Sequence, residues 1–300
     1  MPTFPDGVKQ YGGQPVGAMF ASPWSVVRFV DAANGKDTWD GKAPTRAKAT
    51  IQSAVTASGR GDVIYVRPQA YVVGTGFSRY TEDVTTVLAQ SDLSIIGTVN
   101  TRNPEFGVRW KHTTTQALNN IAPALHLENV GFFTEGATYG VLLTNNGATN
   151  TMRGSDGTTL YNCVFKGQGL YVLSGGTGLT VDNCRFTATY DGTVCQINFS
   201  CSANPGRQLR IRGCEWTDGN GTASSGPSIS IAGPVTEAII RDCHFGLAPT
   251  GNAYISATGT NMGLISNCYF AIADMSLATG IVKGGLFVSG CYDGKVVLID

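Results

Sequence analysis

Acidic and basic side chains recur at two fixed positions of a six-residue segment that the sequence repeats. In the copies VDNCRF, IRGCEW and IRDCHF, the second and fifth residues are acids, bases or a histidine. In chain order they are Asp182 and Arg185, Arg212 and Glu215, and Arg241 and His244. If successive copies form neighbouring strands about 4.8 Å apart, Asp182 lies beside Arg212. In the same register, Glu215 lies between Arg185 and His244.

Such a row of charges has two interpretations. An Asp and a Glu at the right separation would suit the hydrolysis of a glycan. Alternatively, opposite charges on adjacent strands form an exposed ladder in which each pair contributes roughly 0.2–1 kcal/mol. Because each carboxylate already has an arginine neighbour, we predict the ladder and no catalytic set. The alternative candidate catalytic residues are Asp182, Arg212, Glu215 and Arg241.

The six-residue segment, which we call the repeat segment, sets the period of the chain. Its copies start at Leu127 (LENVGF), Leu160 (LYNCVF), Val181, Ile211, Ile240, Ile265 (ISNCYF) and Val288 (VSGCYD). Successive starts are between 21 residues (160 to 181) and 33 residues (127 to 160) apart. A repeat at this period is typical of a solenoid, in which each unit buries its apolar face only by stacking on a neighbour.

The positions within the repeat segment predict its shape. Positions one, four and six are apolar, as in Leu160, Cys163 and Phe165, so they face the core. Position three is Asn, Asp or Gly, the residue types that tolerate a left-handed backbone. The unit is therefore a short strand, a sharp corner and a second short strand. Further strands are expected between the copies, for example in YGVLLTN, GLYVLSG and SISIAG.

Six of the eight cysteines occupy position four of the repeat segment. Disulfides are one interpretation, but the chain is neither small nor visibly secreted. We predict buried free thiols that fill the core, stacked coil upon coil. No zinc site and no cofactor are predicted, because neither the cysteines nor the three histidines follow a ligand spacing.

An amphipathic helix is expected before the first coil. Ala47–Ser58 has apolar residues at helical spacing, with Thr45 as its N-cap, and the strand GDVIYVRP follows. This order of loop, helix and strand resembles the entry segment of pectate-lyase-like proteins. The resemblance covers roughly Asp31–Asp300 and implies an all-β, right-handed parallel β-helix whose open end the helix caps. Lyases of that fold use a basic residue next to a uronate carboxylate, which gives the charged row a further possible role.

Three carboxylates in the loop before this helix are candidate calcium ligands: Asp31, Asp37 and Asp40. Their spacing does not follow the EF-hand pattern, and no Glu closes the loop. Asp, Asn and Gly also form turns. We therefore predict a turn role and no metal.

Residues 1–26 have no regular periodicity and read as an extended docking arm before a single β-helix domain at 27–300. The arm carries the aromatic residues Phe4, Tyr11, Phe20 and Trp24. Such residues suit docking on another protein, or folding back over the end of the same solenoid. Residues 100–124 are expected to bulge from the solenoid wall. The last stretch ends on a strand without a cap, so we expect a partner chain or a trimer axis to cover it.

Composition narrows the function classes. The net charge is zero, which gives no electrostatic case for nucleic acid or membrane partners. No stretch of about 18 apolar residues exists, and the N-terminus does not resemble a signal peptide. An arm, an entry loop and a small β-helix resemble phage virion proteins: capsid decoration proteins, head fibres and appendages. The expected function is structural, in a virion, as a homotrimer bound to the major capsid protein or a neighbouring virion protein. The alternative is a tailspike-type polysaccharide lyase or hydrolase acting on a host glycan.

Overall fold

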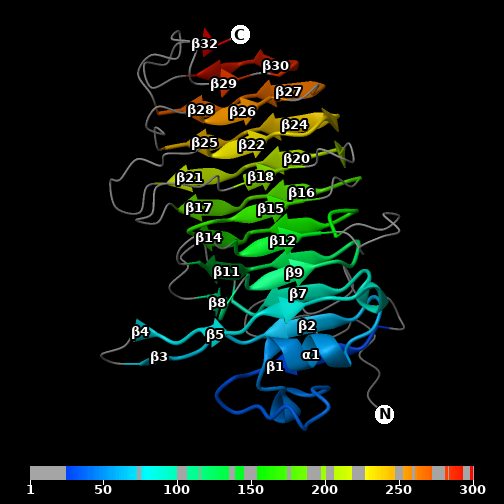
Figure 1. Cartoon of the computed structure of the whole chain (residues 1–300). Helices are drawn as coiled ribbons and strands as arrows, with labels where there is room; N and C mark the ends of the chain where they lie inside the picture. The colour runs from blue at the N-terminus through cyan, green and yellow to red at the C-terminus, as the bar shows by residue number, and fades with distance from the viewer. Residues whose placement is uncertain are drawn as a thin grey trace, which may run out of the picture.

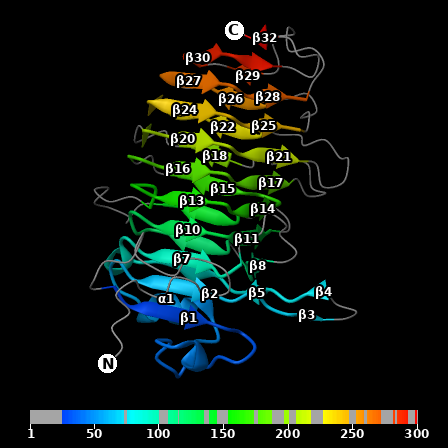
Figure 2. The same cartoon turned by 180° about the vertical axis from the view of Figure 1, so that it is seen from behind.

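The computed structural model is a stack of short parallel strands that wind as a solenoid from β1 to β32 (Figures 1 and 2). It describes residues 25–72, 76–99, 107–114, 116–134, 139–144, 154–173, 177–187, 197–200, 206–217, 227–246, 253–258, 261–271, 281–282, 284–292 and 298–299. Three sheets form the walls, and each coil from β2 to β29 contributes one strand to each. The chain is therefore an all-β, right-handed parallel β-helix, as predicted.

Sheet 1 contains the first strand of each repeat segment and is seen along one side of Figure 2. Its strands are β1 (Val27–Val30), β2 (Val63–Val66), β7 (Ser94–Gly97), β10 (His126–Glu128), β13 (Thr159–Tyr161), β16 (Thr180–Asp182), β20 (Arg210–Arg212), β24 (Ala238–Arg241), β27 (Gly263–Ser266) and β30 (Leu286–Ser289).

Sheet 2 contains the second strand of each repeat segment. Its strands are β5 (Tyr80–Thr81), β8 (Val108–Lys111), β11 (Val130–Phe133), β14 (Val164–Lys166), β17 (Arg185–Thr187), β21 (Glu215–Thr217), β25 (His244–Phe245), β28 (Tyr269–Phe270), β31 (Cys291–Tyr292) and β32 (Leu298–Ile299).

Sheet 3 is formed by the strands that were expected between the copies. They are β6 (Val84–Thr85), β9 (Leu118–Asn120), β12 (Val141–Leu143), β15 (Leu170–Val172), β18 (Ile197–Phe199), β22 (Ile229–Ile231), β26 (Ile255–Ala257) and β29 (Ile281–Val282). Two small pairs lie apart from the walls: β3 (Tyr71–Val72) with β4 (Gly76–Phe77), and β19 (Gly206–Arg207) with β23 (Val235–Thr236).

The core follows the predicted positions. Leu160, Cys163 and Phe165 are fully buried, and their counterparts in the next coils are at most 2% exposed as far as Phe270. The sixth positions form a continuous stack of rings with centroids 4.5–5.4 Å apart: Trp110, Phe132, Phe165, Phe186, Trp216, Phe245 and Phe270. Because ring and thiol repeat once per coil, each coil completes the core of the coil before it.

The third position of the repeat segment is a left-handed corner in each described copy. The φ angles are 57° at Asn129, 51° at Asn162, 52° at Asn183, 59° at Gly213, 56° at Asp242, 51° at Asn267 and 62° at Gly290. We call these third-position residues the corner column, and their side chains also form hydrogen bonds from one coil to the next. Asn162 Nδ2 donates to Asn129 Oδ1 at 2.6 Å, and Asn183 Nδ2 donates to Asn162 Oδ1 at 3.3 Å.

The helix before the first coil is shorter than predicted. α1 spans Ile51–Ala57 and its N-cap is Thr50, whose Oγ1 accepts from Ser53 N. Thr45 instead lies in the 3-10 helix η1 (Pro44–Arg46). The reason is a long-range pairing: Lys48 exchanges backbone hydrogen bonds with the β1 region, which keeps the chain before Thr50 extended. A second 3-10 helix, η2, spans Leu88–Gln90.

Two other expectations need correction. Residues 100–124 do not simply bulge, because β8 and β9 are regular strands of sheets 2 and 3, and Trp110 is a fully buried ring of the core stack. At the other end, the last strand was expected to leave an uncapped edge. Instead, β32 pairs antiparallel with β31, so the edge of β31 is covered within the chain.

In the described part of the chain, no helix has the length and apolar character of a membrane span.

Candidate functional site

The charged row lies on the outside of sheets 1 and 2, and its register is the predicted one. Asp182 and Arg212 are partners on β16 and β20, and their Oδ2 and Nη2 atoms are 2.7 Å apart. Arg185 and Glu215 are partners on β17 and β21, with Nε and Oε2 3.8 Å apart. Both carboxylates are thus engaged by an arginine, which is what the ladder interpretation predicts.

The remaining members of the row do not join these two pairs. Arg241 contacts Asp242, its own corner residue, with Nε 3.6 Å from Oδ2. His244 is in register with Glu215, but its ring stacks on Tyr269 with centroids 4.9 Å apart and an interplanar angle of 8°. Tyr292 continues this column one coil further. The structure therefore places Asp182, Arg212 and Arg241 on sheet 1 and Glu215 on sheet 2, without bringing the four candidate catalytic residues together around one point.

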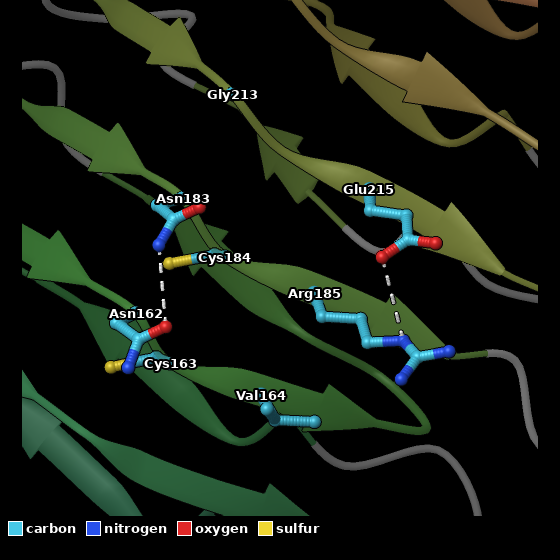
Figure 3. A pocket seen from close by; sticks show the side chains of 8 residues that line it. All are labelled: Asn162, Cys163, Val164, Asn183, Cys184, Arg185, Gly213 and Glu215. Carbon is cyan, nitrogen blue, oxygen red and sulfur yellow. Dashed lines mark hydrogen bonds and ion pairs between the residues drawn. The ribbon is translucent and has the colours of Figure 1, made fainter. Parts of the chain in front are cut away.

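A small recess opens where the corner column is interrupted by Gly213 (Figure 3). Its cavity volume is only about 20 Å³, and it is lined by Asn162, Cys163, Val164, Asn183, Cys184, Arg185, Gly213 and Glu215. In Figure 3, Asn183 points toward Asn162 along the column, while the Arg185–Glu215 pair lies to one side. Ligand pockets usually measure about 300–1,000 Å³, so the recess is too small to enclose a sugar unit.

Two of the three loop carboxylates, Asp31 and Asp40, accept hydrogen bonds within local turns, whereas Asp37 binds backbone N–H groups 12 and 13 residues ahead. Asp31 accepts from Ala33 N and Asn34 N through Oδ1, and its Oδ2 lies 2.7 Å from Arg67 Nη1. Burial raises the pKa of Asp31, but the hydrogen bonds from Asn34 and Arg67 outweigh it, so the pKa is lowered from 3.8.

The other two candidates also face N–H donors. Asp37 accepts from Ala49 N and Thr50 N. Asp40 accepts from Lys42 N, and its Oδ1 lies 3.6 Å from Arg46 Nε. Within the described ranges, no three or more His, Cys, Asp or Glu side chains converge as metal ligands.

One carboxylate that the sequence analysis did not single out binds the first turn of the capping helix α1. Glu82, next to β5, accepts from Ile51 N and Gln52 N at 2.9 and 2.8 Å, at the first turn of α1. Burial raises the pKa of Glu82, and the two backbone hydrogen bonds oppose that shift. No local signal identifies this contact, because it joins residues about 30 positions apart in the sequence.

The described position-four cysteines are buried free thiols, as predicted: Cys163, Cys184, Cys214, Cys243, Cys268 and Cys291. Each thiol contacts a main-chain carbonyl of the preceding coil; Cys184 Sγ, for example, lies 3.5 Å from Leu160 O. Burial raises the pKa of the Cys184 and Cys243 thiols, so neither is an activated nucleophile. Cys195 and Cys201 lie outside the described residues.

The aromatic residues of the predicted arm, Phe4, Tyr11, Phe20 and Trp24, also lie outside the described residues.

The outer face of sheet 1 carries a feature that the sequence analysis missed. The residue before each repeat segment points outward, and in the last three copies it is apolar: Ile239, Leu264 and Phe287. Phe287 is 76% exposed and Leu264 is 38% exposed. We call these three residues the apolar column; their spacing relative to the repeat segment is the signal that would have found them.

Comparison with known proteins adds to the fold but not to the site. No protein-family model matches the sequence, and no curated protein matches it. The chain is similar to the crystal structure of the pectin methylesterase from Aspergillus niger, with a TM-score of 0.50 and 16% identity, over 93% of both chains. It also aligns with the GH136 lacto-N-biosidase from Eubacterium ramulus, with a TM-score of 0.37 and 10% identity, over 89% of this chain and 67% of that one. At this identity, the likeness to the methylesterase shows the parallel β-helix fold alone.

Proposed function

We propose that this chain is a structural protein of a phage particle, of the capsid-decoration, head-fibre or appendage type. Its β-helix is the rigid body, and its arm (residues 1–26) docks it on the major capsid protein or a neighbouring virion protein. The observation that carries the proposal is the pairing of both wall carboxylates, Asp182 with Arg212 and Glu215 with Arg185. Carboxylates held in this way stitch adjacent coils together and leave no acid–base pair poised around a substrate.

The body has the properties that such a scaffold needs. The ring stack, the thiol column and the corner column each run through successive coils. Because every coil is bonded to its neighbours in three sheets, bending would break many contacts at once. The placement in a virion rests on the resemblance of the arm, entry loop and β-helix body to phage virion proteins.

Incorporation into particles tests this function. The full chain and a variant lacking residues 1–24 are each mixed with particles of the phage that encodes the protein, grown without it. Deletion at residue 24 keeps the contact of Ser25 Oγ with Gly61 O, so the body retains its entry to β1. We expect the full chain to co-sediment with the particles and the shortened chain to stay in solution with an unchanged circular dichroism spectrum. Equal incorporation of the two would contradict the docking role.

We also propose that copies associate as a homotrimer through the apolar column. Its residues lie on the last coils of sheet 1, where an exposed row of apolar side chains is costly in water unless a partner covers it. Analytical ultracentrifugation of the wild type is expected to give a trimer, and Phe287→Ser a monomer. Val87→Ser, which changes another exposed apolar side chain, is the matched control. A monomeric wild type, or a trimeric Phe287→Ser variant, would refute this interface.

The second candidate is a glycan-active lyase or hydrolase. The observation that favours it is the aromatic column of His244, Tyr269 and Tyr292, which adjoins Glu215 on the outer wall and would provide ring faces and edges to a sugar chain. Host capsular and cell-wall glycans would be incubated with the wild type and with Glu215→Gln and Asp182→Asn. Product formation that the variants lose would support an enzyme. Absence of product from all glycans would remove this candidate.

A further inference from the structure

The thiol column consists of the six position-four cysteines, and each of its Sγ atoms makes the same two contacts. The first contact is with the main-chain oxygen of position two in the same repeat segment, at 3.2–3.7 Å. The second is with the main-chain oxygen of position one in the preceding repeat segment, at 3.5–3.9 Å. All six side chains therefore have the same orientation.

This common orientation fixes the distance between neighbouring sulfur atoms. The coils are in register at the cysteines, since Arg185 N donates to Cys163 O at 2.9 Å, and the later coils repeat this bond. Neighbouring strands of a sheet lie about 4.8 Å apart, so neighbouring Sγ atoms are also about 4.8 Å apart. The thiols contact each other at this distance, and hydrogen bonding to Cys243 raises the pKa of the Cys268 thiol to about 12.

The spacing excludes one use of paired thiols and suits another. A disulfide requires about 2.05 Å between its sulfurs, so the coils cannot be joined in that way without moving the main chain. The thiols of the column are free, in agreement with this limit. A metal ion held in a straight line by two thiolates, with metal–sulfur bonds of about 2.3 Å, requires about 4.6 Å between the sulfurs. The coil spacing therefore matches a linear, two-coordinate metal site.

The surroundings of the column determine the kind of ion. Zn²⁺ takes four ligands, and in the described ranges no three His, Cys, Asp or Glu side chains converge. Thiolates favour soft metal ions. The column lies between apolar side chains of positions one and six, and its thiols are at most 2% exposed. Because a net charge is costly there, a divalent ion, which is neutral with two thiolates, fits better than a monovalent one.

We propose that neighbouring thiols of the column form linear binding sites for a soft divalent cation, of which Hg²⁺ is the example, with one ion between two coils. As each metal–sulfur bond forms, the thiol loses its proton to solvent, so two protons leave for each ion and no electron is transferred. Six thiols in a row divide completely into neighbouring pairs in a single way: Cys163 with Cys184, Cys214 with Cys243, and Cys268 with Cys291. The filled column therefore holds one ion for each of these pairs.

An ion at such a site joins two coils through their core. It adds a direct link between side chains that otherwise only pack on each other, and it binds the folded column better than the separated thiols of the unfolded chain. The ion therefore stabilises the folded chain by linkage. This inference is independent of the proposed virion role, because it concerns the core of the isolated body.

Refolding with Hg²⁺ tests the sites, since the folded core keeps the thiols away from solvent. The full-length chain with Cys195→Ser and Cys201→Ser, which removes the two cysteines outside the column, is refolded from urea with mercuric chloride. An excess of glutathione then removes ions that are held by a single protein thiolate. We expect one bound ion for each pair of column thiols, a native circular dichroism spectrum, and X-ray absorption that shows two sulfurs at about 2.3 Å from mercury.

Two double variants in this background separate the neighbourhood of the thiols from their number. Each variant leaves four thiols in the column. Cys163→Ala with Cys291→Ala leaves four consecutive thiols and should bind two ions. Cys184→Ala with Cys243→Ala leaves Cys268 and Cys291 as the single neighbouring pair and should bind one ion. The same pairs replaced by serine provide a second set if an alanine variant does not refold without mercury.

Three results would overturn the proposal. The first is an equal mercury content in the two double variants. The second is mercury with fewer or more than two sulfur ligands. The third is a chain that refolds without Hg²⁺ but not with it, because the ion would then not fit the native column. Since no particle and no arm variant is used, such a failure is distinct from a failure of the docking experiment.

Discussion

Asn162 donates a hydrogen bond from Nδ2 to Oδ1 of Asn129, 2.6 Å away on the preceding coil. Both residues have left-handed φ angles, 51° and 57°, and both are only 4% exposed. The same side chain therefore serves two purposes: it tolerates the corner conformation and it joins two coils. Glycine at this position would serve only the first purpose, and a residue such as Gln only the second.

Substitutions at Asn162 should separate these two contributions. Asn162→Gly keeps the backbone freedom and loses the side-chain bonds, for an expected loss of about 1–2 kcal/mol in the free energy of unfolding. Asn162→Ala adds the strain of a left-handed alanine, about 1–2 kcal/mol more. Urea unfolding measures both. If the two variants are equally stable, the corner conformation contributes nothing and this account is wrong.

The interruption of the column at Gly213 leads to a second prediction. A Cβ atom built on Gly213 comes no closer than 3.9 Å to a neighbouring atom, and its φ of 59° suits asparagine. Gly213→Asn should therefore extend the column toward Asn183 and raise the unfolding free energy by roughly 0.5–1 kcal/mol, since it also reduces the freedom of the unfolded chain.

Gly213→Ala is the matched control for this variant. It fits the same space but lacks the amide, and the left-handed strain should make it less stable than the wild type by about 1 kcal/mol. Thermal unfolding of the three proteins, followed by circular dichroism, gives the order. A Gly213→Asn variant that is no more stable than Gly213→Ala would show that the added amide makes no bond.

Much of this architecture was predictable from the repeat segment. The inward positions, the left-handed corner and the register of Asp182 with Arg212 follow from one local pattern. What failed depends on contacts between distant segments. The helix starts at Ile51 because Glu82 and the β1 region bind the residues around it, and nothing near Thr50 in the sequence encodes those partners. The burial of Trp110 was not predicted, because its coil has no contiguous repeat segment: β7 ends at Gly97 and β8 begins only at Val108.

The acid side of the stability profile should depend on Asp31. Its folded-state pKa lies below the ordinary value of 3.8, because hydrogen bonds from Asn34 and Arg67 outweigh the opposing effect of burial. The unfolded chain therefore binds the proton more readily, so the stabilisation is present above about pH 4. It is lost as the pH falls through the folded-state pKa.

Unfolding experiments at pH 6 and pH 3 in low salt check this dependence. The wild type should be more stable than Asp31→Asn at pH 6, and the difference should shrink at pH 3. Arg67→Gln, which removes the partner 2.7 Å from Oδ2, should weaken the same pH dependence. A difference between the wild type and Asp31→Asn that is constant from pH 6 to pH 3 would be inconsistent with a lowered pKa.

The ring stack should dominate the stability of the middle coils. Phe186 lies between Phe165 and Trp216, with both centroid distances 4.9 Å and interplanar angles of 6° and 9°. Phe186→Ala removes a fully buried ring and both of its stacking contacts, for an expected loss of about 3–5 kcal/mol. Phe186→Leu refills most of the volume and should lower the unfolding free energy clearly less.

Phe287→Ala, on an exposed ring, should change the unfolding free energy of the monomer by about 0.5 kcal/mol or less. Equal losses for Phe186→Ala and Phe186→Leu would mean that stacking geometry, and not the filled volume, accounts for the stability of these coils.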